Sequence, residues 1–441
     1  MISEISKEFK MIKLIKFAIP SIIMLIFSAL YSIADGVFIS RFINTDALSS
    51  FNIVYPFINV VWGLGLMLST GGSAVIARKL GEGKKEEAIS NFSFLIIVGI
   101  ILGFSISLFG YIFSQRIIEL LGATESLLKY CQGYFFVTLI FIPFYILNLL
   151  YQMLSITAGK PNMGLILTVV GGVSNVILDY VFIVIFNYGI GGAALATGLG
   201  NLIPVIIGTI FFFKKDKMLY FDKFKCDFKM LKESCTNGSS EMVVNLSMGV
   251  TTMLFNFKLM EYLGSDGIAA MSIVLYGQFL ITSIYIGFSS GVAPVISYSY
   301  GEQNRDLIKK IIRGSITFIS VISVISYGIS ILIASNIVEI FTPKGSTVYY
   351  LGYEGFIIFG TSFLITGINI FASSMFTAFS NGKVSATISF LRTFVFLVGA
   401  IFILPEIFNT FGIWIAVTVA EVLTIVVSIR YIYKYRDVYG Y

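Results

Sequence analysis

Long apolar segments alternate with short polar ones along the whole chain. A transmembrane helix needs about 20 consecutive apolar residues to cross a hydrocarbon core of roughly 30 Å. Segments of this kind recur along the sequence, and polar stretches such as 81–88 and 301–310 separate them. The pattern predicts an all-α polytopic membrane protein with twelve transmembrane helices. The expected spans are residues 14–40, 48–77, 91–113, 130–153, 162–186, 190–213, 234–262, 268–298, 312–334, 353–376, 384–404 and 411–433.

The spans fall into two halves that repeat one another. At a shift of 220 residues, identical residues coincide in polar and glycine-rich segments. Because six spans are an even number, both halves enter the membrane from the same side, as parallel repeats do. We therefore predict a six-helix bundle over 1–213, a cytoplasmic linker loop over 214–233 and a second six-helix bundle over 234–441. The matched pairs include Asp46 and Asp266, Ser69 and Ser289, Gly71 and Gly291, Gly81 and Gly301, and Glu82 and Glu302.

The basic residues are distributed unevenly between the two sides of the membrane. Lys and Arg concentrate in the cytoplasmic loops of membrane proteins. If the N-terminus is cytoplasmic, 24 of the 30 basic residues lie on the inner side, and two lie within spans, Lys258 and Arg392. We therefore expect both termini in the cytoplasm and an uncleaved first span rather than a signal peptide. The outer basic residues are Arg41, Arg116, Lys129 and Lys344.

Composition supports a membrane protein and excludes several enzyme classes. The 441 residues are 57% hydrophobic and 12% charged, whereas soluble domains carry about 25% charged residues. The chain has no histidine, which excludes Ser-His-Asp hydrolysis and His-ligated zinc. It has no P-loop sequence, and its three cysteines show no CxxC spacing. We expect no enzyme activity, no cofactor and no metal beyond a coupling ion, and we attribute the net charge of +6 to cytoplasmic loops rather than nucleic-acid binding.

Acidic side chains at membrane depth mark a candidate ion site, because a charge buried in the bilayer is costly. Asp35 lies roughly 9 Å below the outer end of the first span, and Asp179 lies roughly 12 Å deep in the fifth. Tyr31 and Asn175 each precede one of these acids by four residues and share its helix face. Thr197 lies roughly 10 Å deep in the sixth span. We expect all five side chains in one layer of the outer half.

Two neighbouring carboxylates in a low dielectric cannot both stay ionised cheaply, so the pair should bind a proton or another cation. Oxygen ligands suit a hard ion such as Na⁺, and we expect H⁺ or Na⁺ as the coupling ion. The alternative is that these groups only join helices by hydrogen bonds. The equivalent second-half positions carry no acid, which favours one ion site in the first bundle. Those positions are Val398, Phe402, Ala420 and the neighbourhood of Phe255.

Pro20 and two amides are further candidates for transport. Pro20 lies in the first span, fifteen residues before Asp35, and proline bends helices. A bend that responds to protonation of Asp35 would gate a central cavity, and a static kink is the alternative. Asn148 and Gln152 form an i, i+4 pair in the fourth span that either lines the cavity or bonds a neighbouring helix.

Two more carboxylates lie within the second half. Glu241, in the inner part of the seventh span, either binds a cationic substrate or pairs with a basic group such as Arg392. We interpret Arg392 and Glu421 as a structural pair within the second bundle. These residues give the second half a charge pattern that differs from that of the first.

The segments GGSAVIARKLGEGKKEEA (71–88) and GVAPVISYSYGEQNRDLIK (291–309), set in two six-span halves, resemble the multidrug and toxic compound extrusion (MATE) family. The resemblance covers nearly the whole chain and implies two bundles around a V-shaped central cavity. It also implies exchange of H⁺ or Na⁺ for organic, often cationic, compounds. Asn369 stands in span ten, where some members have an aspartate, so a second ion site is not expected. The residues that match the family are Asp35, Asn175, Asp179 and Thr197 at the cation site (the Na⁺ ligands if Na⁺ binds), Tyr31 beside it, Pro20 as the bending proline, and Asn148, Gln152 and Glu241 in the cavity.

Together these observations predict a secondary active antiporter that exports small organic, cationic or amphipathic, compounds by alternating access. We expect a monomer in a bacterial inner membrane that contacts lipid and no nucleic acid. A lipid-linked oligosaccharide flippase of the same superfamily is the alternative, but such flippases line their cavity with several basic residues, and only Lys258 and Arg392 lie within spans here. An intramembrane protease is a third interpretation, but a two-aspartate protease would need no twelve-span repeat.

Overall fold

The computed structural model describes residues 9–43 and 45–441, and every regular element in these residues is a helix. The first half contains six long helical segments and one short helix, α5, that the hydrophobic pattern did not predict. They are α2 (Met11–Phe42), α3 (Thr45–Gly81), α4 (Lys85–Ile112), α5 (Ser114–Leu120), α6 (Glu125–Thr157), α7 (Pro161–Asp179) continued by the π-helix η1 (Tyr180–Ile185), and α8 (Gly189–Phe212).

The second half begins with one very long helix and contains six further helical segments. The elements are α9 (Phe228–Gly301), α10 (Arg305–Phe341), α11 (Thr347–Gly360), α12 (Phe363–Ala378), α13 (Gly382–Phe390), the π-helix η2 (Leu391–Phe396) and α14 (Leu397–Tyr439). The side chain of Asp227 accepts a hydrogen bond from the Met230 backbone N–H at 2.9 Å, so α9 begins six residues before the predicted span at 234.

The long helices resolve into twelve passes. The described residues contain nine helical stretches long and apolar enough to cross a membrane, plus the pair α11 and α12, which is bent by 51°. The 74 residues of α9 would span roughly 110 Å if straight, but Gly264 has φ 64° and ψ −155° and reverses the chain. Asn409, with φ 52°, likewise breaks α14. Both breaks fall in predicted gaps between spans, and the predicted twelve-helix fold is confirmed.

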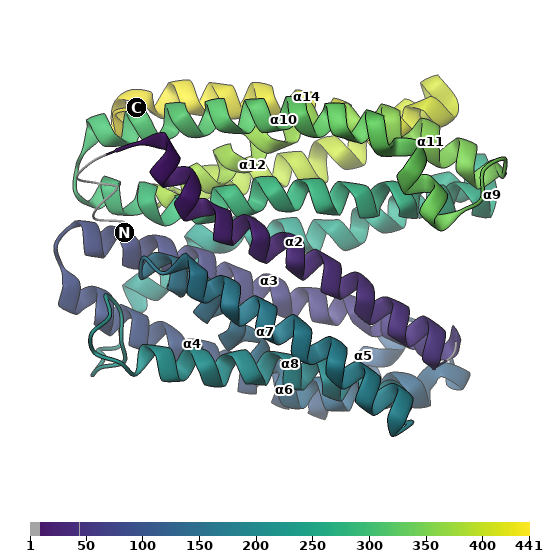
Figure 1. Ribbon diagram of the computed structural model, residues 1–441, viewed down its shortest axis with the longest axis horizontal. Coiled ribbons are helices and arrows are strands. Elements are labelled where there is room, and N and C mark those ends of the chain that lie inside the picture. Colours follow the sequence, from purple (N-terminus) through teal and green to yellow (C-terminus); the bar gives the residue numbers. More distant parts are fainter. Residues whose placement is uncertain (1–8, 44) are drawn as a thin grey trace.

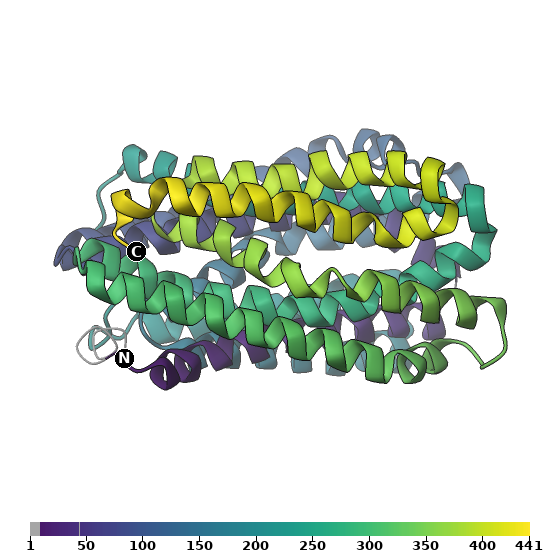
Figure 2. The ribbon, with the colours of Figure 1, turned by 90° about the horizontal axis from the view of Figure 1, so that it is seen from above.

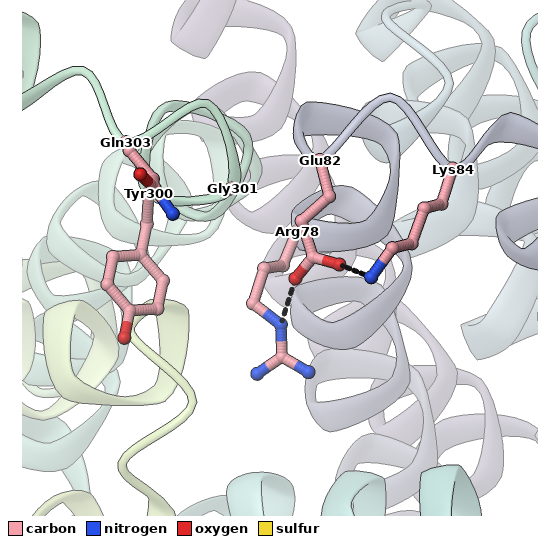
Figure 3. A pocket seen from close by; sticks show the side chains of 6 residues that line it. All are labelled: Arg78, Glu82, Lys84, Tyr300, Gly301 and Gln303. Atoms are coloured by element: carbon pink, nitrogen blue, oxygen red, sulfur yellow. Dashed lines mark hydrogen bonds and ion pairs between the residues drawn. The ribbon is translucent and has the colours of Figure 1, made fainter.

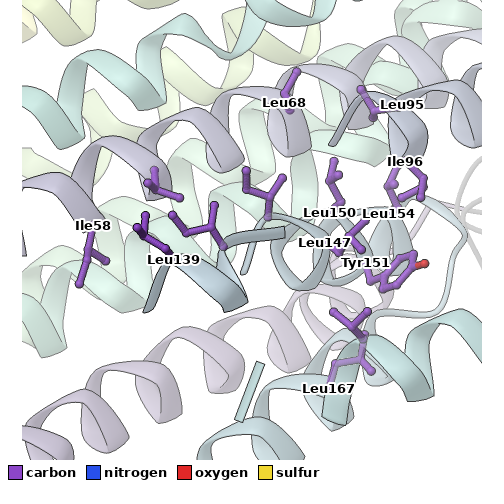
Figure 4. Close-up of a cluster of buried hydrophobic side chains, with 14 of the residues drawn as sticks. Ile58, Leu68, Leu95, Ile96, Leu139, Leu147, Leu150, Tyr151, Leu154 and Leu167 are labelled. Atoms are coloured by element: carbon purple, nitrogen blue, oxygen red, sulfur yellow. The ribbon is translucent and has the colours of Figure 1, made fainter. Parts of the chain in front are cut away.

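The helices form two bundles with separate apolar cores. Figure 1 shows one group containing α4, α6, α7 and α8 and another containing α10, α12 and α14, while α10 and α14 extend along most of the molecule in Figure 2. The first core draws its buried residues from Ala47 to Met230, including Leu68, Leu95 and Leu150 (Figure 4). A second-bundle core extends from Phe255 to Val417. Each half therefore has an interior of its own, and a third buried cluster joins the two halves, with Leu14 and Met153 from the first and Phe288 and Phe376 from the second.

Reciprocal glycine contacts relate the two bundles by the shift found in the sequence. A Cβ on Gly81 would collide with the backbone oxygen of Tyr298, and a Cβ on Gly301 would collide with the backbone oxygen of Arg78. Adding 220 to the residue numbers of one contact gives the other. The ends of α3 and α9 thus meet backbone to backbone around a pseudo-two-fold axis, as parallel repeats require.

Helix α2 connects the two bundles. Its first half lies against α9, where a Cβ on Gly287 would be 2.6 Å from the Cα of Ile22 and a Cβ on Gly291 would be 3.0 Å from the Cα of Ala18. Phe17 is buried there in a cluster with second-bundle residues. Farther along, α2 packs against α7, and Figure 1 shows its oblique path. A change in the shape of α2 would therefore alter how the bundles sit against each other.

Candidate functional site

The structure brings Asp35 and Asp179 together. Asp35 lies in the second half of α2, and Asp179 is the last residue of α7, directly before the π-helix η1. Gly172 lets the helices approach closely, since a Cβ there would lie 2.7 Å from the ring of Tyr31. The two carboxyl groups are near enough for their charges to interact. π-Helical turns often occur at functional sites.

Three of the four carboxyl oxygens of this pair are buried and have no hydrogen-bond partner among the described residues. Asp179 is 0% exposed, and neither of its oxygens has a hydrogen-bond partner among the described residues. Oδ1 of Asp35 is also buried and has no hydrogen-bond partner among the described residues. Buried polar atoms are almost always hydrogen-bonded, and exceptions point to a bound ion, a proton or strain. The donor set therefore fits a proton shared by the carboxyls or a hard cation between them.

A chain of hydrogen bonds joins the predicted ion-site residues to the predicted cavity residues. The Asn175 amide donates to the Thr197 hydroxyl at 3.4 Å, and the Asn201 amide donates to the Thr197 backbone oxygen at 2.9 Å. The Asn148 amide donates to Asn201 Oδ1 at 2.9 Å, and the Gln152 amide donates to Asn148 Oδ1 at 3.1 Å. Sequence reasoning placed these residues in two separate groups, and Asn201 connects them.

Several site residues were missed from the sequence. Asn201 follows Thr197 by four residues on α8, a spacing that could have identified it. Three more tyrosines surround the acids, since the phenol groups of Tyr55, Tyr134 and Tyr145 lie within electrostatic range of Asp35. No spacing distinguished them from the other tyrosines among the 24 in the chain.

Pro20 lies away from the acid pair. It is buried in α2 beside the residues that contact Gly287 and Gly291. Fifteen residues separate it from Asp35, roughly 22 Å along a helix. Its position is thus at the contact between the bundles rather than in the ion site.

Glu241 lines a small pocket between the bundles. The pocket has a volume of about 30 Å³, and both bundles line it, through residues that include Thr70, Ser73, Met153, Glu241, Ser290 and Ser374. That volume accommodates about two water molecules, whereas drug-sized ligands need pockets of roughly 300 Å³ or more. A ligand could therefore reach Glu241 only after the bundles separate.

Arg392 pairs with Glu421 rather than with Glu241. Its Nε–H donates to Glu421 Oε1 at 2.8 Å, and the Asn369 amide donates to Glu421 Oε2 at 2.7 Å. The Ser428 hydroxyl donates to Asn369 Oδ1 at 2.9 Å. Glu421 is only 4% exposed, and both of its carboxylate oxygens accept hydrogen bonds. Within the described residues, no ion pair joins Arg392 to Glu241.

A family model described as MatE matches residues 20–181 and again residues 241–402. The two matches cover more than half of the chain, and the second begins 221 residues after the first. This chain belongs to the MatE family. The finding confirms the resemblance of residues 71–88 and 291–309 and identifies a membrane-spanning transporter of the MATE type.

Two similar bacterial multidrug export proteins support membership of the MATE family. The chain is 27% identical over 425 residues to the multidrug export protein MepA of Staphylococcus aureus (strain bovine RF122 / ET3-1), covering 96% of this chain and 93% of that protein. It is 27% identical over 430 residues to MepA of Staphylococcus saprophyticus. With its many apolar helices, this supports a multi-pass bacterial inner-membrane protein.

Solved structures share the fold at low sequence identity. An outward-facing multidrug resistance MATE transporter of the MOP superfamily gives a TM-score of 0.92 at 22% identity, over 97% of this chain and 96% of that one. A mutant of the Vibrio cholerae MATE transporter VcmN gives 0.89 at 20% identity, over 96% and 97%. A MOP superfamily transporter from Pyrococcus furiosus, whose reverse pocket polarity suggests a different function, gives 0.90 at 21% identity, over 97% and 96%. The fold alone therefore does not fix the cargo.

As in a MATE transporter that alternates access, the bundles meet at an interface that must open. A cleft of about 530 Å³ lies between α3 and α9 at the end where α2 begins and α14 ends. Figure 3 shows Arg78 and Tyr300 on opposite sides of it. Arg78 crosses to the second bundle with two hydrogen bonds to Glu233, at 2.6 and 3.1 Å. This ion pair links the bundles and would have to break for this end to open.

Proposed function

We propose that this protein is a secondary active antiporter that exports small organic, cationic or amphipathic, compounds in exchange for H⁺ or Na⁺. The observation that carries the proposal is the pair Asp35 and Asp179, with its buried and unsatisfied carboxyl oxygens in the first bundle of a MATE fold. A static structure gains nothing from two neighbouring acids whose buried oxygens lack partners, because their desolvation costs energy. A site whose charge changes during transport needs such groups.

The ion site is proposed to act on the cavity through the polar chain described above. When H⁺ or Na⁺ neutralises the acids, their repulsion disappears and α2 and α7 can pack more closely. If Na⁺ binds, its ligands come from Asp35, Asn175, Asp179 and Thr197, with Tyr31 alongside. The Asn175–Thr197–Asn201 bonds then transmit the change toward Asn148 and Gln152. Pro20 gives α2 a place to bend at its contact with the second bundle.

The substrate is proposed to bind between the bundles beside Glu241. A carboxylate in this pocket favours a cationic compound, and the MepA relatives are named as multidrug export proteins. The basic side chains within the spans are already engaged, Lys258 with Glu406 at 2.7 Å and Arg392 with Glu421 at 2.8 Å. This argues against a flippase, whose pyrophosphate cargo needs free cations.

Orientation and assembly complete the proposal. The excess of Lys and Arg on one side supports the proposal that both termini lie in the cytoplasm. We propose a monomer, since each chain contains both bundles and the whole ion site.

Reconstitution tests the function directly. Purified protein in proteoliposomes would be given a pH gradient or a Na⁺ gradient separately, with ethidium as a cationic probe. We expect one of the gradients to drive ethidium movement against its concentration, and ethidium in turn to dissipate that gradient. Ethidium movement that ignores both gradients would refute the antiport.

A further inference from the structure

The second bundle carries two intramembrane carboxylates, Glu241 and Glu421, and Arg392 is bonded to Glu421. The Arg392 Nε–H donates to Glu421 Oε1 at 2.8 Å. The helix that leads to Arg392 starts one turn below Glu241, the carboxylate of the central pocket, since the Gly382 N–H donates to Asn237 Oδ1 at 3.1 Å and a Cβ on Gly382 would lie 2.5 Å from the Cα of Asn237. Helix η2, which carries Arg392, packs against α9, which carries Glu241. The pocket acid thus lies on the helix that packs against the segment carrying Arg392, and Glu421 holds the guanidinium of Arg392.

Glu421 is itself fixed by two further bonds. Asn369 donates to its second oxygen at 2.7 Å and also to its backbone oxygen at 3.0 Å, and Ser428 orients Asn369. A carboxylate held in this way offers the guanidinium a rigid, fully desolvated partner. The anchor therefore competes effectively against Glu241 for Arg392.

We propose that Glu421 holds Arg392 away from Glu241, so that Arg392 and Glu421 determine how strongly the central pocket binds cations. The inference rests on the proposed function, in which Glu241 receives a cationic substrate. A tethered guanidinium released from its anchor would reach Glu241 at an effective concentration in the millimolar range or above. Because its planar fork matches a carboxylate, it would then exclude a cationic substrate from the pocket.

The test compares four variants of the full-length protein with the wild type in detergent by ethidium fluorescence. Glu421→Gln releases Arg392 while Gln keeps a bond to Asn369, and we expect ethidium binding to weaken by at least about tenfold. Arg392→Gln removes the competing cation, and ethidium should bind at least as tightly as in the wild type. The double variant Arg392→Gln/Glu421→Gln should regain wild-type affinity. Lys258→Gln is the matched control, roughly 25 Å along α9 from Glu241, and should leave affinity unchanged.

The two single variants should change ethidium affinity in different directions if Glu421 positions Arg392, and in the same direction if the pair only stabilises the bundle. If Arg392→Gln and Glu421→Gln weaken ethidium binding equally and the double variant is no better, the network only stabilises the bundle and the inference is overturned. Thermal unfolding of each form shows that the compared proteins are folded. A wild-type protein that binds no ethidium, or a Glu241→Gln variant that binds it normally, would instead refute the cationic pocket of the proposed function.

Discussion

The two bundles share one helical plan but hold their buried carboxylates in opposite ways. In the first, Asp179 is fully buried and neither of its oxygens has a partner in the part of the chain that the structure describes. In the second, Glu421 is nearly as buried, yet Arg392 and Asn369 satisfy both of its oxygens. The first arrangement must take its cation from solution, whereas the second carries a cation as part of the chain.

Equivalent helices carry both arrangements, so the difference lies in residue identity rather than in the fold. Asn148 on α6 and Asn369 on α12 are separated by 221 residues, the offset of the two family matches. Glu421 on α14 lies one residue from Ala420, the counterpart of Thr197 on α8. Under the proposed function, one bundle exchanges ions and the other provides a fixed charge beside the substrate pocket.

The largest expected effect is on transport by the acid pair. Asp35→Asn should reduce gradient-driven ethidium movement in proteoliposomes to background, because the site no longer changes charge. Asp179→Asn should do the same, and the double variant should lose little more, since the two acids act as one unit. Wild-type rates in either single variant would remove the distinction between the bundles.

The stability of the folded protein should depend on the Arg392–Glu421 pair more than on the acid pair. Arg392→Gln leaves Glu421 buried without its cation, and breaking a buried pair in this way costs about 3–5 kcal/mol. Asp179→Asn removes a buried acid that has no partner, so the free energy of unfolding should stay the same or rise. Denaturation of both variants in mixed micelles measures the contrast. Equal losses would show that the acid pair is also structural.

The interface between the bundles offers a smaller effect. The counterparts of Arg78 and Glu233 at a shift of 220 are Tyr298 and Lys13, which cannot form an ion pair, so the link at 2.6 Å exists on one side of the pseudo-symmetry only. The pair is partly exposed, and Glu233→Gln should favour separation by about 1 kcal/mol, or about fivefold in population.

A native cysteine can report that separation. Cys235 is half-buried and packs against the first-bundle core. In a Cys226→Ser background, its rate of modification by a thiol reagent should rise about fivefold in Glu233→Gln. The matched control is Glu87→Gln, which breaks the exposed Lys79–Glu87 pair within the first bundle and should leave the rate unchanged. Equal rates in the two variants would mean that the interbundle pair does not hold this end closed.

The smallest expected effect is on stability and comes from the N-terminal caps of the equivalent helices α4 and α10. Asn304 caps α10 by accepting the Leu307 backbone N–H at 3.1 Å, whereas its counterpart Lys84 makes no side-chain cap on α4. Asn304→Ala should lower the free energy of unfolding by about 1 kcal/mol, and Lys84→Ala should lower it less, because its exposed ion pair contributes little. Thermal melting of the two variants checks the order, and a reversed order would contradict the assigned caps.

The hydrophobic pattern predicted most of the fold because each span must bury its own backbone hydrogen bonds in lipid. The breaks near Gly264 and Asn409 were predicted as loops, while the short helix α5 carries too few apolar residues to signal itself. Asp35 and Asp179 could be placed in one layer by depth alone. The Arg78–Glu233 pair and the surrounding tyrosines could not, because their contacts depend on how distant helices pack, which residue spacing does not encode.

Ion release on substrate binding tests most directly that the exchangeable cation sits on the first-bundle acids. Ethidium would be added to weakly buffered purified protein, with a pH indicator and, in a parallel sample, radioactive Na⁺. We predict release of a proton or of Na⁺ from the wild type and from Arg392→Gln/Glu421→Gln, and no release from Asp35→Asn. Undiminished release from Asp35→Asn, or its loss only in the second-bundle variant, would contradict the account.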